Sequence, residues 1–157
     1  SIRRDLPVGP TFRWRARTTD TAGRTGSWRY SPTARVARYQ ETDRAFAYAG
    51  AWKAHATDNA SGGGQRSAGA AGASASISLT DVRQFAIVGP RSADRGSLEV
   101  WVDGAKVATV SERASTTVHR RVLYVGSLAR GPGVSHTIEV RAVGNGRIDV
   151  DAVLALS

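Results

Sequence analysis

The histidines and two closely spaced aspartates are the side chains of this 157-residue chain with the greatest capacity for catalysis. His55, His119 and His136 form neither a His-x-x-x-His zinc pair nor part of a Ser-His-Asp order. Asp149 and Asp151 share one face of an expected strand, but like charges at this spacing are usually solvated or cap a turn. A glycosidase needs two carboxylates about 5 to 10 Å apart across a cleft. Nothing in the sequence designates such a pair, so we predict no catalytic residue and a protein that is not an enzyme.

Trp101 is the residue best suited to bind a sugar. Apolar residues alternate along 96–102 and should face a core, which turns Glu99, Trp101 and Asp103 to the opposite face of the strand. A flat indole between two carboxylates would stack on a sugar ring and accept hydrogen bonds from its hydroxyls. The alternative is that a neighbouring loop or the N-terminal segment covers the Trp101 ring.

Five further residues complete the predicted ligand-binding set, and each has a structural alternative. They are Tyr124, His119, Arg121, Asp94 and Arg95. The strand that carries Tyr124 could take either register, so its ring could face a ligand or the core. His119 and Arg121 could supply polar contacts or form an ordinary solvated face. Asp94 and Arg95 could belong to a binding loop at one end of the fold or could simply brace that loop.

The composition excludes several classes of function. The chain has no Cys, so it holds no disulfide, reactive thiol or Cys-based zinc site. The net charge of +9 comes almost entirely from Arg, a bias typical of GC-rich coding, and the charges are dispersed along the chain. The densest run is Arg13, Arg15 and Arg17, which is too short to track phosphates and argues against nucleic acid as a partner. Polyanion binding through Arg is a separate hypothesis.

The ends and the hydropathy of the chain suggest a fragment. No apolar run approaches the ~18 residues of a membrane span, and no signal peptide is recognisable. The chain begins at Ser1 and contains no Met, so we expect a processed or truncated piece of a longer precursor.

Short strands at close intervals predict an all-β fold from residue 73 onward. The expected strands are 73–79, 83–88, 96–102, 106–110, 118–125, 135–143 and 148–156. Asp103-Gly104 and Asn145-Gly146 are hairpin signals, and no convincing helical periodicity appears. The pattern indicates an antiparallel β-sandwich or barrel.

The N-terminal segment predicts one β-hairpin. Aromatic residues and arginines alternate over 11–18, the segment 20–26 is rich in turn residues, and a strand returns after it. The rings of Phe12, Trp14 and Trp28 need a cover, because a lone hairpin is not stable in water. We expect the hairpin to pack on the domain that follows or to self-associate with another copy of the chain.

Two parts of the chain resemble known families. The strings Val100-Trp-Val-Asp-Gly104 and Gly133-Val-Ser-His-Thr-Ile138 resemble galactose-binding-domain-like jelly rolls, which include carbohydrate-binding modules at the C-termini of secreted bacterial proteins. The string Asp20-Thr-Ala-Gly-Arg-Thr-Gly-Ser-Trp28 resembles the last two strands of a fibronectin type III or bacterial immunoglobulin-like domain. We therefore divide the chain into a truncated hairpin with its linker, residues 1–38, and a jelly-roll β-sandwich, residues 39–157.

This resemblance implies a non-catalytic accessory module of a larger secreted protein, located extracellularly or at the cell surface. Its implied partners are carbohydrate or cell-surface polysaccharide and the upstream domains of the parent chain. The alternative is a structural or protein-interaction module that assembles without a glycan ligand. The resemblance also implies a structural calcium as the one candidate cofactor, which needs six to eight oxygen ligands. Its candidate side-chain ligands are Glu41, Asp43, Asp149 and Asp151.

Overall fold

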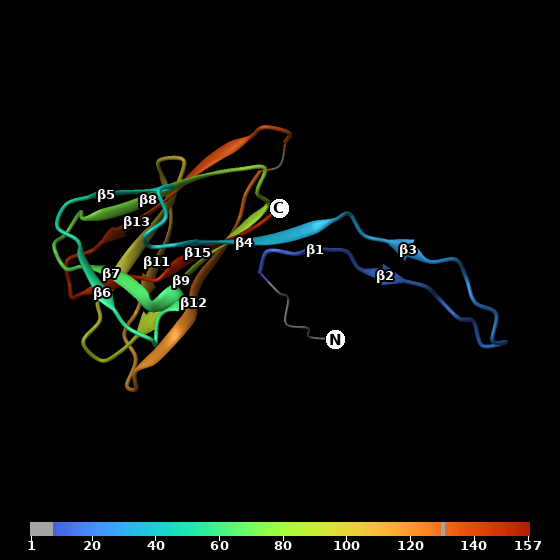
Figure 1. Ribbon diagram of the computed structural model, residues 1–157, viewed down its shortest axis with the longest axis horizontal. Helices are drawn as coiled ribbons and strands as arrows, with labels where there is room; N and C mark the ends of the chain where they lie inside the picture. Colours follow the sequence, from blue (N-terminus) through green and yellow to red (C-terminus); the bar gives the residue numbers. More distant parts are fainter. Residues whose placement is uncertain (1–7, 130) are drawn as a thin grey trace.

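The computed structural model of the chain describes residues 8–129 and 131–157. Its two largest sheets are antiparallel, have five strands each and face one another (Figure 1). The first sheet holds, in spatial order, β1 (Thr11–Phe12), β4 (Ala34–Gln40), β15 (Ala152–Leu156), β9 (Gln84–Arg91) and β12 (Val118–Ser127). The second sheet holds β11 (Ala105–Ser111), β10 (Ser97–Val102), β13 (Ser135–Ala142), β8 (Ser74–Thr80) and β5 (Phe46–Ala49). The predicted all-β sandwich is confirmed.

The chain passes repeatedly from one sheet to the other. It runs from β8 in the second sheet to β9 in the first, returns for β10 and β11, and crosses again at β12, β13 and β15. This wrapping is typical of a jelly roll. A third, smaller sheet lies beside the sandwich and contains β14 (Ile148–Val150), β7 (Gly64–Ala68) and β6 (Lys53–Ala56). A short 3-10 helix, η1 (Ser61–Gly63), leads into β7.

Period-two alternation of apolar residues builds the core between the sheets. In β10, Leu98 and Val100 are fully buried, whereas Glu99 between them and Trp101 after them face outward. In β13, alternate residues from His136 to Ala142 are buried in the same way. The largest apolar side chain in the core is Phe85 of β9, which is 1% exposed. These inward faces leave the odd-numbered residues of β10 and β13 on one outer sheet surface.

The two predicted hairpin turns have different outcomes. Asp103 and Gly104 have φ angles of 50° and 80°, as a tight turn between β10 and β11 requires, so this hairpin is confirmed. The prediction that Asn145-Gly146 closes a hairpin is wrong. The strands on either side, β13 and β14, pair with other strands and belong to different sheets. The Asn145 side chain instead accepts a hydrogen bond of 2.8 Å from the backbone N–H of Ser97.

The last predicted strand, 148–156, is divided at Asp151. Residues before Asp151 form β14 in the small sheet, and residues after it form β15 in the first sheet. The Asp151 carboxylate accepts the backbone N–H of Ser61 at 2.8 Å and 2.9 Å, which fixes the crossing point to η1. The expected boundary between residues 38 and 39 falls within β4, and residues 1–7 of the expected N-terminal segment lie outside the described residues.

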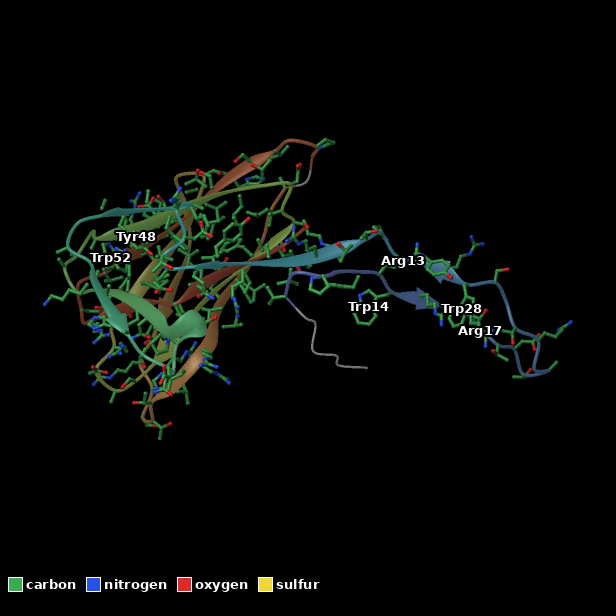
Figure 2. All side chains as sticks on the ribbon, viewed as in Figure 1. Arg13, Trp14, Arg17, Trp28, Tyr48 and Trp52 are labelled. Atoms are coloured by element: carbon green, nitrogen blue, oxygen red, sulfur yellow. The ribbon has the colours of Figure 1, made fainter. Side chains whose placement is uncertain are left out.

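The N-terminal hairpin projects from the sandwich as an arm, defined here as residues 11–30 (Figures 1 and 2). At its root β1 pairs with β4, and further out β2 (Arg15–Ala16) pairs with β3 (Arg29–Tyr30). The hairpin is therefore present, but the expectation that the sandwich covers its rings is wrong. Trp14 is 53% exposed and Trp28 is 39% exposed. The β1–β4 pairing holds the arm in line with β4 and away from the sheet faces.

Candidate functional site

The candidate site is a polar surface around Trp101 on the outer face of the second sheet, which we call the Trp101 platform. It is formed by Glu99, Trp101, Lys106, Glu139 and Arg141. The antiparallel register brings them together, because Trp101 of β10 lies opposite Lys106 of β11 and opposite Glu139 of β13. Outward residues of neighbouring strands lie about 4.5 to 5.5 Å apart at Cβ, so their side chains touch.

Direct contacts hold the Trp101 ring in place. Its Nε1 donates a hydrogen bond of 3.0 Å to Oε2 of Glu99, and the guanidinium carbon of Arg141 lies 4.0 Å from the ring centroid. The Lys106 ammonium donates to the other oxygen of Glu99 at 3.0 Å. Nε of Arg141 donates to Glu139 at 2.6 Å. The indole is therefore half-buried and fixed in orientation.

The carboxylates of the platform are held in the ionised form. The hydrogen bond from Lys106, followed by that from Trp101, lowers the pKa of Glu99 below its ordinary value. The hydrogen bond from Arg141 lowers the pKa of Glu139 in the same way. An ionised carboxylate is a strong acceptor for a hydroxyl, and lysine and arginine are donors. The surface thus combines a fixed ring, with the Arg141 guanidinium over one face, with carboxylate acceptors and cationic donors.

Asp103 does not border Trp101 on the other side as predicted. It sits in the turn and accepts a 2.8 Å hydrogen bond from the N–H of Thr137, and its second oxygen lies 2.7 Å from Nδ1 of His136. The turn gives Asp103 a positive φ and directs its carboxylate back onto β13. The role of second carboxylate belongs instead to Glu139, which sequence reasoning missed because it lies on a different strand.

The other predicted ligand-binding residues on β12 lie apart from Trp101. Tyr124 packs against Phe85 at the edge of the core, with ring centroids 5.8 Å apart. His119 and Arg121 are exposed on the same strand, and Arg121 borders a shallow hollow of about 430 Å³. Since β12 is an edge strand of the first sheet and β10 belongs to the second, these residues do not join the platform.

Asp94 and Arg95 form the local brace that was the structural alternative. Nη1 of Arg95 donates to Asp94 at 2.6 Å, and the same guanidinium forms an ion pair with the buried carboxylate of Asp149. Arg147 donates to the other oxygen of Asp149 at 2.5 Å. The loop is therefore tied to β14 by charge pairs.

The four predicted calcium ligands do not form one cluster, so that prediction is corrected. Glu41 and Asp151 are neighbours, since the N–H of Glu41 donates to the carbonyl oxygen of Asp151 at 3.2 Å, but Asp43 and Asp149 do not join them. Asp149 is fully buried between two arginines, and Asp151 is engaged by the N–H of Ser61. Asp43 accepts the N–H of Ala45 within its own turn, and Glu41 is buried. Among residues 8–129 and 131–157, no group of three or more His, Cys, Asp or Glu side chains could hold a metal ion.

A buried acidic residue that sequence reasoning missed lies beside Asp149. Glu112 follows β11 and is 0% exposed, and its Oε2 accepts the backbone N–H of Asp149 at 2.9 Å. Burial raises the pKa of Glu112 to about 9. The residue is therefore protonated at neutral pH. Its position at the end of a strand, outside any motif, left no signal in the sequence.

Comparison with known proteins identifies the fold class, an antiparallel β-sandwich. The sequence matches no protein-family model and no curated protein. An exo-β-1,3-galactanase from Phanerochaete chrysosporium, solved with galactose, is similar in structure over 81% of this chain and 30% of its own, with 16% identity and a TM-score of 0.57. A Paenibacillus xanthan lyase is similar over 74% of this chain and 12% of its own, with 16% identity and a TM-score of 0.57.

A third structural neighbour is a family two carbohydrate esterase from Cellvibrio japonicus. It matches 79% of this chain and 34% of its own length, with 15% identity and a TM-score of 0.50. The chain therefore spans between 12% and 34% of these three proteins. At such identities the likeness establishes a shared fold. Across the part of the chain that the structure describes, no helix has the length and apolar character needed to cross a membrane.

Proposed function

We propose that this chain is a non-catalytic, galactose-binding-domain-like module of a larger secreted protein, and that it binds carbohydrate on the Trp101 platform. The observation that carries the proposal is the fixed Trp101 ring, which donates a hydrogen bond to Glu99 on its own strand and has the Arg141 guanidinium of the next strand over one face. The β-sandwich fold supports it, since the structural neighbours named above carry names of carbohydrate-active enzymes.

The chemistry of the platform fits a neutral or weakly charged sugar. A pyranose presents an apolar C–H face, which suits an indole, and equatorial hydroxyls, which suit the planar groups around it. Glu99 and Glu139 accept from hydroxyls, whereas Arg141 and Lys106 donate to them. Because the strands of the sheet hold these groups rigidly, little conformational entropy is lost on binding.

The experiment is isothermal titration calorimetry with galactose and β-1,3-galactotriose, the sugars in structures of the exo-β-1,3-galactanase, and with nigerose, the sugar in the structure of a similar α-1,3-glucanase. A broader polysaccharide panel by affinity electrophoresis accompanies it. Wild type should bind at least one glycan, and Trp101→Ala should lower the affinity by about tenfold or more, the loss of one stacked ring. Trp28→Ala, which removes a ring from the arm, is the matched control and should bind as wild type does. A blank panel at millimolar concentrations would contradict the proposal.

A second candidate function, an assembly module, is favoured by the apolar side of the arm. Phe12 and Trp14 meet edge to face with centroids 6.3 Å apart, and Trp14 is 53% exposed. On this reading residues 1–38 are the last hairpin of a fibronectin type III or immunoglobulin-like domain, and the rings dock on that domain or on another copy. Sedimentation velocity should then show concentration-dependent association that Trp14→Ser abolishes. A monomer at all concentrations would exclude docking between copies.

A further inference from the structure

The arm carries a dense positive charge away from the sandwich. Residues 11–30 contain five arginines and a single acidic residue, Asp20, and the side chain of Asp20 is paired with Arg24 at 2.8 Å. The labelled side chains of Figure 2 show Arg13, Arg17 and Trp28 spread along this arm, well separated from Tyr48 and Trp52 of the sandwich.

Three of the arginines stack on aromatic rings across the hairpin. The guanidinium carbon of Arg13 lies 4.4 Å from the Tyr30 centroid, and those of Arg15 and Arg17 lie 4.4 Å and 4.6 Å from the Trp28 centroid. Arg15 is paired with Tyr30 in the register, so Trp28 and Tyr30 share the arginine face. The Trp28 ring therefore lies among the arginines, whereas the Trp14 ring contacts Phe12. Alternate residues on a strand are about 7 Å apart, so the arginines form a row.

Stacking leaves the hydrogen-bonding edge of each guanidinium available. A guanidinium stacked on a ring directs its N–H groups outward in its own plane, where they match a carboxylate or sulfate. Within the described part of the chain, the side chains of Arg13, Arg15 and Arg17 make no hydrogen bond or ion pair. Arg17 and Arg29 also border a shallow hollow of about 400 Å³, together with Thr18 and Ser27.

We propose that the arginine face of the arm is a second binding site, separate from the Trp101 platform, for an acidic polysaccharide. Charge complementarity supports an anionic partner and disfavours a second copy of the chain, which would itself carry a net charge of +9. Single-stranded nucleic acid is the rival anionic partner, and the oligodeoxynucleotide named below tests it. The choice of a polysaccharide rests on the proposed carbohydrate-binding function.

The test is affinity electrophoresis and calorimetry of the full chain with polygalacturonate, with neutral dextran and a single-stranded oligodeoxynucleotide as rival probes. Wild type should bind polygalacturonate, and the affinity should fall about tenfold as NaCl rises from about 0.05 M to about 0.5 M. The double variant Arg15→Gln/Arg17→Gln should weaken binding by about tenfold, because the loss of one charge-assisted contact is sufficient for a change of that size.

The matched control is Arg44→Gln/Arg113→Gln, which removes the same charge from exposed positions of the sandwich. This control should bind as wild type does, and thermal melting should show both double variants folded. Equal weakening by the two variants, tighter binding of the oligodeoxynucleotide, or no binding of polygalacturonate would overturn the inference.

Trp101→Ala separates this inference from the proposed function. If Trp101→Ala abolishes polygalacturonate binding and the arm variant does not, the arm site is refuted and the platform stands. If polygalacturonate binding depends on the arm while no neutral glycan binds, the arm site stands and the platform is refuted.

Discussion

The Arg141 guanidinium lies 4.0 Å from the centre of the Trp101 ring, and the same side chain is held by the Glu139 carboxylate at 2.6 Å. This stack fixes the indole on the outer sheet face. We predict that Arg141→Ala lowers the free energy of unfolding by about 0.5 to 2 kcal/mol, the range for a partly desolvated cation–π contact. It should also weaken glycan binding, because the ring loses its fixed orientation. Chemical denaturation followed by tryptophan fluorescence measures the first effect, and calorimetry measures the second. An Arg141→Ala variant with wild-type affinity for glycan would contradict the positioning role of Arg141.

The pair formed by Asp103 and His136 predicts a raised histidine pKa. Nδ1 of His136 lies 2.7 Å from Asp103 and Nε2 lies 3.0 Å from the carbonyl oxygen of Ala129, so only the imidazolium can donate to both. The hydrogen bond to Asp103, followed by that to Ala129, raises the pKa of His136 above 6.5. NMR titration of the His136 imidazole should show a midpoint above 6.5 in wild type, and Asp103→Asn should lower that midpoint. An identical midpoint in both proteins would contradict the pairing.

The sign of the linked stability change follows from the raised pKa of His136. Below about pH 6.5 the histidine is protonated in both the folded and the unfolded chain, and the ion pair contributes fully. As pH rises through the folded pKa, that contribution is lost. The melting temperature of wild type should therefore fall more steeply than that of Asp103→Asn over this window.

Glu112 predicts a loss of stability toward alkaline pH. Its folded pKa of about 9 lies above the ordinary value of 4.5, so the folded state retains a proton that the unfolded chain has lost. Stability should fall between about pH 4.5 and pH 9, by up to about 1.4 kcal/mol per pH unit. Asp149 also opposes ionisation of Glu112, whereas Arg95 and Arg147 moderate the effect.

The variant Glu112→Gln cannot titrate and should remove this slope. Its stability relative to wild type should therefore increase from pH 6 to pH 8.5 in thermal melts. Glu139→Gln is the control, since the pKa of Glu139 is lowered and its titration lies below that window. Parallel pH curves for wild type and Glu112→Gln would show that Glu112 is ionised when folded.

We predict that Leu98→Ala greatly lowers the free energy of unfolding. Leu98 is 0% exposed, on the inner face of the strand that presents Trp101. Its truncation should lower the free energy of unfolding by about 2 to 5 kcal/mol, whereas Val107→Ala, at a side chain 47% exposed, should change it by less than about 0.5 kcal/mol. Urea denaturation compares the two variants. Similar small effects in both would contradict the assignment of β10 to the core.

The local pattern predicted the part of the site that lies on one strand, whereas Lys106, across the predicted turn, was not among the predicted site residues. Alternation along β10 placed Glu99 and Trp101 outward, and the Asp103-Gly104 turn fixes Lys106 opposite Trp101. Arg141 could not be placed, because the β10–β13 pairing joins residues about 40 positions apart and depends on the complete topology. The register between strands that are distant in the sequence depends on the tertiary fold, and the alternation of apolar residues along one strand does not encode it.

Two incorrect predictions have similar physical causes. The rings of Phe12, Trp14 and Trp28 were all expected to be covered, but the register of the hairpin places Trp28 among the arginines, where it is 39% exposed. Asp149 and Asp151 were expected on one strand face, but the chain changes sheets at Asp151 and separates their surroundings. In both places a longer-range pairing determines where the side chain points.

The most direct test of the Trp101 platform is an NMR titration that follows the indole N–H signals. The chain has four tryptophans, Trp14, Trp28, Trp52 and Trp101, so there are four such signals, and single Trp→Phe variants assign them. On addition of a neutral oligosaccharide that wild type binds, the Trp101 signal should shift in a saturable manner, since its N–H is hydrogen-bonded to Glu99 in the platform. A stationary Trp101 signal, with saturable shifts confined to the other three, would contradict the account.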